Sequence, residues 1–144
     1  MTSLPADRPA GLHPEYVAGC DAGELRLQCC AECGHVRFPP SPVCPVCLST
    51  AHLWQVASGA ATLWSWVRVH QRYFQDFYRP TPYAVGFVEL AEGPMMMSGV
   101  SEPAGRSLRS GMALRLRFED TPLGRLPWFD IAWDETLDEQ RARA

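Results

Sequence analysis

The feature that most constrains the fold is the segment "CCAECGHVRFPPSPVCPVC", residues 29–47, which holds five of the chain's six cysteines. Four of them form two CxxC units, with Cys30 and Cys33 in the first and Cys44 and Cys47 in the second. A CxxC turn aims both sulfurs at one point and offers backbone N–H groups to the thiolates, so two such turns complete a tetrahedral zinc site. The spacing therefore predicts a rubredoxin-like zinc ribbon with these four ligands.

Other side chains near the ribbon leave alternatives open. Cys29 could replace Cys30 with a C-x3-C spacing, but the glycine after the second sulfur of the first unit eases a tight turn and favours Cys30. His35 and His52 could each substitute for a thiolate. Because four cysteines are already available, we interpret both as surface histidines. Cys20 and Cys29 have no recognisable base or nucleophile motif beside them, so we interpret both as inert thiols.

A zinc ion held by four thiolates has no open coordination position, so it cannot activate water or polarise a carbonyl. The first residues carry Pro, Asp and Arg where a secretory signal needs an apolar run, and no segment has the length of a membrane span. We therefore expect a cytoplasmic protein, in which paired cysteines bind metal more often than they form disulfides. The zinc is expected to be structural, since it lets a segment with little core of its own hold a fixed shape.

The charge of the chain argues against nucleic acid as a partner. The net charge is −3, and all 13 of the Lys and Arg residues are arginines. A single-stranded nucleic acid needs a sustained positive channel along its backbone. Residues 51–133 are the only segment with more arginines than acidic residues. An anion site is therefore expected in that segment.

The rest of the sequence predicts a mainly β protein. Residues 1–28 form an N-terminal helical segment, whose helix begins near Pro14 and ends at Gly19 or Gly23, and residues 29–50 form the ribbon. Residues 51–133 contain strand candidates at 60–70, 83–90, 95–100, 112–118 and 128–133. Five short strands separated by turns predict a five-stranded OB-fold barrel. The charged segment 134–144 has no apolar face and is expected to be disordered.

Strict alternation along two of these strands assigns their faces. In the strand at 60–70 it places Trp64, Trp66 and Arg68 on one side. In the strand at 112–118 it places Arg115 and Arg117 on a solvated face. The stretch after the strand at 60–70, residues 71–82, is expected to be a loop stiffened by two prolines.

The order of the motifs resembles that of the zinc-ribbon OB-fold proteins that accompany thiolases and other acyl-CoA enzymes. The likeness covers residues 14–133 and includes "CxxCG…PP…CPxC", "PYAVGFVELAEGPMMMSGV" and "LRSGMALRLRF". It implies a non-catalytic accessory subunit that binds a thiolase-like or hydratase partner in a hetero-oligomer. It also implies that the subunit helps to hold the CoA end of a shared acyl-CoA substrate. Since the chain has no fused hydratase domain, the catalytic partner is expected to be a separate polypeptide.

The resemblance leaves several properties open. Condensation, acyl transfer and retro-aldol cleavage all occur in this family, and neither the acyl group nor the stoichiometry follows from the sequence. The chain lacks a nucleophile elbow, a Walker or Rossmann glycine motif and an HExxH motif, so it is not expected to be an enzyme alone. The alternatives are a single-stranded nucleic-acid-binding OB-fold protein and, more weakly, an enzyme that uses Cys20 or Cys29.

The stretch from the end of the strand at 60–70 through the loop interleaves arginines and aromatic rings. Guanidinium groups bind phosphates and aromatic faces stack on an adenine, so this stretch suits the CoA end of a substrate. Docking of the partner and simple packing of the rings are the alternatives, and Arg106 and Arg109 are the next candidates for an anion. The candidate residues for CoA binding or partner docking are Arg68, His70, Arg72, Phe74, Phe77, Tyr78 and Arg79. Among them, Arg72 and Arg79 are expected to contact phosphate, and Phe74, Phe77 or Tyr78 to stack.

Overall fold

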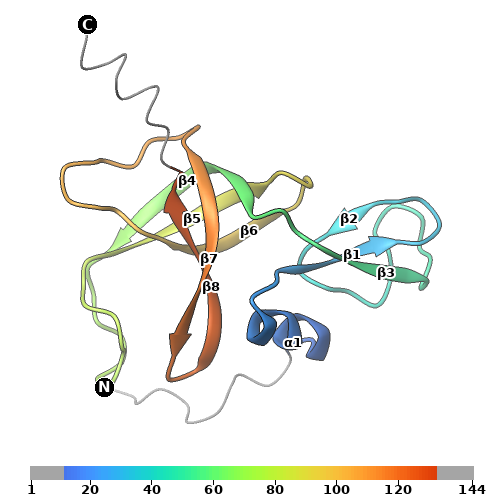
Figure 1. Cartoon of the computed structure of the whole chain (residues 1–144), viewed down its shortest axis with the longest axis horizontal. Helices are drawn as coiled ribbons and strands as arrows, with labels where there is room; N and C mark the ends of the chain where they lie inside the picture. Colours follow the sequence, from blue (N-terminus) through green and yellow to red (C-terminus); the bar gives the residue numbers. More distant parts are fainter. Residues whose placement is uncertain (1–11, 133–144) are drawn as a thin grey trace, which may run out of the picture.

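The computed structural model describes residues 12–132, which form a zinc-ribbon module and a β-barrel with one short helix beside them (Figure 1). No helix in this part of the chain is long and apolar enough to cross a membrane. Residues 1–11 of the expected N-terminal helical segment and the expected disordered tail lie outside the described residues. The elements in chain order are α1 (Pro14–Ala22), β1 (Arg26–Cys30), β2 (Val36–Arg37), β3 (His52–Val56), β4 (Ala60–Val69), β5 (Tyr83–Leu90), β6 (Met95–Val100), β7 (Ala113–Thr121) and β8 (Gly124–Ile131).

The helix α1 begins and ends at local signals in the sequence. Pro14 occupies its first turn, and the ring Nδ1 of His13 accepts a hydrogen bond from the Glu15 N–H at 3.1 Å. Of the two glycines expected to end the helix, Gly23 does so, with a left-handed φ of 77°. Gly19 lies inside the helix, where a Cβ atom would come 2.7 Å from the Glu24 carbonyl oxygen.

Strands β1, β2 and β3 form the antiparallel sheet of the ribbon in the order β2-β1-β3. The expected boundary after residue 28 lies inside β1, and the expected boundary after residue 50 precedes β3, which pairs with β1 from Arg26↔Val56 to Cys30↔His52. The sheet therefore takes residues from both neighbouring segments. Strand β1 begins before the expected boundary because Leu25 and Leu27 are buried in the core and Arg26 between them is not. This two-residue alternation is that of a strand, and it starts soon after the end of the helix.

The five strands expected after the ribbon are present and close into a barrel in the order β4-β5-β6-β8-β7, with β7 pairing with β4. The pair of β6 and β8 is parallel and the other pairs are antiparallel. This arrangement confirms the expected fold class. Strand β8 begins at Gly124, earlier than the expected residue 128, because a tight turn after Thr121 lets Gly124 pair directly with it.

One hydrophobic core joins the two modules. Leu25 and Leu27 from the ribbon side belong to the same buried cluster as Leu63, Val88 and Phe129 of the barrel. The connection is continued by the backbone, where the N–H of Ala57 donates to the carbonyl of Leu25 at 2.8 Å. The ribbon is thus packed on the barrel rather than tethered by a linker, and the helix α1 lies below the junction in Figure 1.

A β-bulge corrects the expected face assignment on β4. The register with β5 shifts between Leu63 and Ser65, so Trp64 is the extra residue and points outward. Its side chain is 59% exposed and its ring meets that of Phe87 at a centroid distance of 5.9 Å. Trp66 instead packs against the core. Strict alternation had placed both rings on one side, and a single inserted residue reverses that relation.

Candidate functional site

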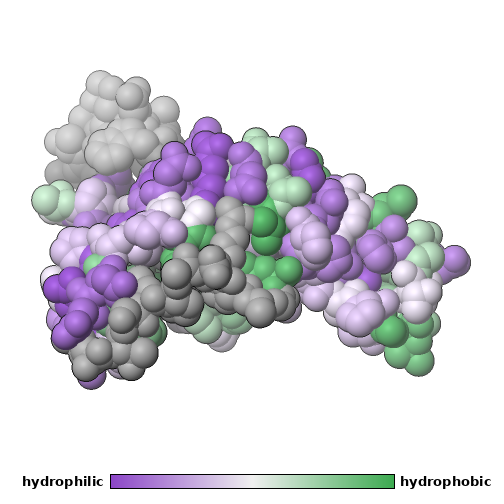
Figure 2. Space-filling view, turned by 90° about the horizontal axis from the view of Figure 1, so that it is seen from below, coloured by the Kyte–Doolittle hydropathy of each residue, from purple (hydrophilic) through white to green (hydrophobic). Residues whose placement is uncertain are grey.

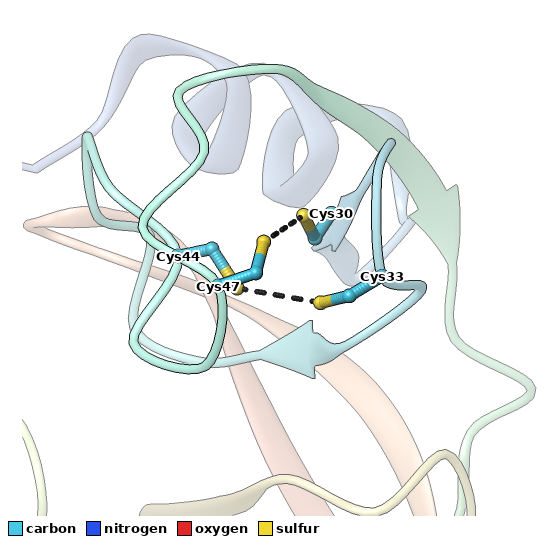
Figure 3. Close-up of side chains that lie close together, drawn as sticks. All are labelled: Cys30, Cys33, Cys44 and Cys47. Atoms are coloured by element: carbon cyan, nitrogen blue, oxygen red, sulfur yellow. Dashed lines mark hydrogen bonds between the residues drawn. The ribbon is translucent and has the colours of Figure 1, made fainter.

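The four cysteines of the two CxxC units converge at one point in the ribbon (Figure 3). Their sulfur atoms all lie within 4.8 Å of one another, with Cys30 Sγ 3.4 Å from Cys47 Sγ and Cys33 Sγ 3.7 Å from Cys44 Sγ. A Zn–S length of about 2.3 Å puts the sulfurs of a tetrahedral site about 3.8 Å apart. The spacing of these sulfurs therefore fits a four-thiolate metal site.

Backbone N–H groups prepare the first sulfur of each unit for a cation. The pKa of Cys30 is lowered to about 6, chiefly by the N–H of Cys33, and the pKa of Cys44 is lowered chiefly by the N–H of Cys47. For Cys33 the N–H of His35 acts in the same direction, but burial and the neighbouring thiols outweigh it and raise the pKa to about 12. Four adjacent thiols do not all ionise on their own, so four thiolates need a metal cation to offset their charge.

Strand geometry separates Cys29 from this cluster. Adjacent residues of β1 point to opposite faces, so the thiol of Cys29 lies away from that of Cys30 and directs its Sγ to the carbonyl of Gly34 at 3.5 Å. His35 and His52 are also outside the cluster. The ring of His52 packs edge-on against Trp54 at a centroid distance of 5.7 Å. The structure thus brings together the four cysteines of the two CxxC units, and Cys29 and the two histidines lie outside this cluster.

A second candidate site is a cavity of about 660 Å³ at one end of the barrel. The end of β4, the start of β5, the end of β6, the start of the loop after β6 and the exit of the 70–82 loop form its walls. Arg68, Arg79 and Arg106 line it together with one acidic side chain, Glu102. Its volume is within the usual range for small-molecule sites, about 300–1,000 Å³. The cavity lies within residues 51–133, the segment in which an anion site is expected.

Arg79 is held by contacts on two sides. Its guanidinium carbon lies 3.5 Å from the centroid of the Trp128 ring, which forms part of the cavity wall, and its Nη2 is paired with Glu119. The same carboxylate accepts from Arg117 Nη1 at 2.8 Å, and Arg117 Nε donates to Asp130 at 2.7 Å. Arg117 is therefore part of an ion-pair network, which corrects its expected place on a solvated strand face. Strand pairing is the reason, because it sets Asp130 of β8 opposite Arg115, two residues from Arg117 on the same face of β7.

Arg68 makes a two-point contact with Glu102. Its Nε donates to Oε2 at 2.9 Å and its Nη2 donates to Oε1 at 2.5 Å. The hydrogen bonds from Arg68 lower the pKa of Glu102 below its ordinary value. Glu102 belongs to the loop after β6, which is 34 residues further along the chain, and no motif in the sequence indicated this pairing. Sequence reasoning did not identify Trp128 or Glu102 as candidates, although both line the cavity and contact its arginines.

The remaining candidate residues of the loop lie apart from this cavity. Arg72 donates to the backbone carbonyls of Phe74 and Gln75, so its guanidinium closes its own loop. The ring of Phe77 packs on those of Tyr78 and Tyr83 at centroid distances of 5.0 and 5.2 Å. A separate cavity of about 430 Å³ lies along the loop. Its lining residues are Arg72, Phe77, Tyr78, Arg79, Pro80 and Thr81. His70 is exposed just after β4, and Phe74 is half-buried.

Exposed apolar side chains gather on two surfaces. One surface is the outer face of the barrel, where Trp64 and Val67 of β4 and Met97 of β6 are exposed, Met97 by 70%. Phe87 of β5 connects the two strands, because it is paired with Met97 and its ring meets that of Trp64. The ribbon exposes a second set, Val43, Val46, Leu48 and Leu53. Figure 2 shows apolar surface at the ribbon end and near the junction of the modules, whereas the barrel end of that view is mainly hydrophilic. Exposed apolar patches of this kind are typical of protein interfaces.

The barrel and the cysteine cluster together define a zinc-ribbon OB-fold protein. Two family models match the chain: "ChsH2, rubredoxin-like zinc ribbon domain" over residues 17–52, and "ChsH2, C-terminal OB-fold domain" over residues 54–119. A solved chain described as "Ltp2-ChsH2(DUF35) aldolase" is 30% identical with a TM-score of 0.78, and the match covers 88% of this chain and all of that one. The chain belongs to the DUF35 family and carries the zinc-ribbon and OB-fold domains of its ChsH2 type.

Curated relatives agree with this assignment. A probable enoyl-CoA hydratase alpha subunit of Thermomonospora curvata is 33% identical over 106 residues, which are 73% of this chain. A DUF35 domain-containing scaffold protein of Pyrococcus furiosus is 31% identical over 87 residues, which are 59% of this chain and 62% of that protein. The matched region is only 33% of the length of the hydratase subunit.

Proposed function

We propose that this protein is a non-catalytic accessory subunit of an acyl-CoA-processing enzyme, that it binds a thiolase-like catalytic subunit in a hetero-oligomer, and that it helps to hold the CoA moiety of the substrate. The observation that carries the proposal is the match, over the whole ribbon and barrel, to a chain of an aldolase described as containing a DUF35 component. The names of the hydratase alpha subunit and the scaffold protein support the same type of role.

Within this function the four cysteines bind one structural zinc ion. The distances between the sulfurs, and the N–H groups directed at Cys30 and Cys44, support Cys30, Cys33, Cys44 and Cys47 as its ligands. The zinc supplies no reaction chemistry, because four thiolates leave no coordination position for a substrate. Its role is to fix the knuckles of the ribbon, which expose Val46 and Leu48.

The cavity arginines hold the CoA moiety. Arg68 and Arg79 were candidates from the sequence and both line the cavity, so they are the preferred phosphate contacts. His70, Arg72, Phe74, Phe77 and Tyr78 stay candidates for CoA or partner contact. A role in binding single-stranded nucleic acid is less well supported, because the net charge is −3 and the arginines do not supply the sustained positive channel that such a strand needs.

We expect the purified chain alone to turn over no acyl-CoA thioester, and turnover to appear when a thiolase-like subunit is added. The physical reason is that the chain offers binding groups but no nucleophile or base at motif spacing. Light scattering after size exclusion measures complex formation, and a thioester assay measures turnover. Activity of the chain alone that disappears in Cys20→Ala or Cys29→Ala would contradict the proposal.

Two variants separate binding of CoA from docking. Arg68→Ala is expected to leave the complex intact and to raise its KM for acyl-CoA about tenfold, which corresponds to one lost charge-assisted hydrogen bond. Met97→Asp places a charge on the apolar outer face and is expected to weaken the complex itself. Pro122→Asp, which adds the same charge at an exposed position in the turn between β7 and β8, serves as the matched control and should alter neither quantity. An unchanged KM in Arg68→Ala would remove that residue from the CoA site.

A further inference from the structure

The cavity at the end of the barrel contains an internal anion. Three guanidinium groups line it, and the one carboxylate among its lining residues, that of Glu102, is bound to Arg68. The two donors that Arg68 gives to Glu102 are Nε and Nη2, which form the fork that carboxylates and phosphates use for two-point binding. Any anion that is to use the same fork must first displace Glu102.

The pair is placed so that displacement is possible. The side chain of Arg68 is 45% exposed and that of Glu102 is 25% exposed, so neither charge is locked in the core. Glu102 lies in the loop that follows β6, and residues 101–107 of this loop form one wall of the cavity. Ser101 is fixed by its hydrogen bonds with Phe129 and Trp128, but residues 102–107 have no regular structure and include Gly105, so Glu102 can move while the end of β6 stays in place.

The charge balance indicates which ligand gains from the exchange. A monocarboxylate that replaced Glu102 would put back the charge it removed and gain little. A phosphate ester carries a charge of about −1.5 to −2 and has three acceptor oxygens, so it can bind Arg68 and also attract the other cavity arginines, Arg79 and Arg106. The cavity also has apolar walls, formed in part by Pro82, Tyr83 and Trp128, which fit the organic part of such a ligand.

We propose that this cavity binds a phosphate-bearing ligand, and that Glu102 is a built-in competitor that must leave Arg68 before the phosphate enters. Binding then replaces the pair of Arg68 and Glu102 by a pair of Arg68 and phosphate, and the 101–107 wall of the cavity is released from β4. The inference rests on the proposed function only in taking the phosphate end of CoA as the natural source of this group. Without the ligand, Glu102 occupies the donors of Arg68.

The experiment titrates the full-length chain, without a partner, with inorganic pyrophosphate in a calorimeter. Glu102→Gln keeps the shape of the side chain and removes its charge, so we expect it to bind pyrophosphate roughly three- to tenfold more tightly than wild type, because the competing state no longer withholds Arg68. Arg68→Ala should lose most of the affinity. Glu89→Gln, which neutralises an exposed carboxylate outside the cavity, is the matched control and should bind as wild type does. Acetate should bind much more weakly than pyrophosphate to all of these chains.

A second measurement reports on the loop directly. Hydrogen exchange of residues 101–107 should become faster when pyrophosphate is added to wild type, and should already be fast in Glu102→Gln. Equal pyrophosphate affinity in wild type and Glu102→Gln would overturn the competitor role, and the absence of pyrophosphate binding in both would overturn the site. Neither result depends on a catalytic subunit, so failure of this inference is distinguishable from failure of the accessory role, which is measured by complex formation.

Discussion

Cys30→Ser is expected to abolish stoichiometric zinc binding and to unfold the ribbon knuckles while leaving the barrel folded. Zinc binding stabilises small four-ligand modules by about 10–16 kcal/mol. The serine hydroxyl is a much poorer zinc ligand than the thiolate it replaces. The barrel should persist because Leu25 and Leu27, which anchor the ribbon to the common core, lie outside the segment that the metal holds. Metal analysis of the purified protein gives the zinc content.

Hydrogen exchange shows where the effect ends. Residues 31–50 should lose protection in Cys30→Ser, whereas β4 and β5 should keep it. The matched control is Cys29→Ser, which changes the neighbouring thiol on the opposite face of β1 and should retain one zinc per chain. Loss of zinc in Cys29→Ser together with its retention in Cys30→Ser would show that Cys29, and not Cys30, is the ligand. Less than half an equivalent of zinc in fresh wild type would count against the site as a whole.

Gly99→Ala is expected to destabilise the barrel more than most single-atom changes. A Cβ atom at this position would lie 1.8 Å from Cζ3 of Trp128 and overlap the ring, so the indole must leave its place. The ring also carries Arg79 on its face and donates from Nε1 to Ser101 Oγ at 2.9 Å. Overpacking of this kind costs about 1–3 kcal/mol, and the lost contacts of the ring add to it. Urea unfolding followed by tryptophan fluorescence or circular dichroism measures the change.

A double variant tests the cause. Trp128→Leu removes the obstacle, so Gly99→Ala should cost clearly less in the Trp128→Leu background than in wild type, and the coupling free energy should exceed about 0.5 kcal/mol. Additive effects would mean that the strain lies elsewhere in the strand pair of β6 and β8. The same experiment bears on the cavity, because displacement of Trp128 also removes the surface on which Arg79 lies. Pyrophosphate affinity should therefore fall in Gly99→Ala.

The sequence by itself determined the parts of this protein that depend on local spacing. Two CxxC units ten residues apart have few geometries open to them, and the bounds of β5 and β6 follow from short apolar runs between turn residues. The sequence offered Gly19 and Gly23 as ends of the helix. The helix ends at Gly23, which adopts the left-handed conformation that is common after the last helical residue. The loop at 71–82 was likewise marked by its prolines.

Only the tertiary structure decided what depends on residues distant along the chain. The bulge at Trp64 arises from pairing with β5, so no alternation rule within β4 could place that ring on the outer face. Arg117 became part of an ion-pair network because β8 brings Asp130 to it, and Glu119, which Arg117 also binds, is shared with Arg79 of the 70–82 loop. The meeting of Arg68 with Glu102, 34 residues apart, has the same origin. Side-chain pairing across strands is set by barrel closure, and closure is a property of the whole fold rather than of any one segment.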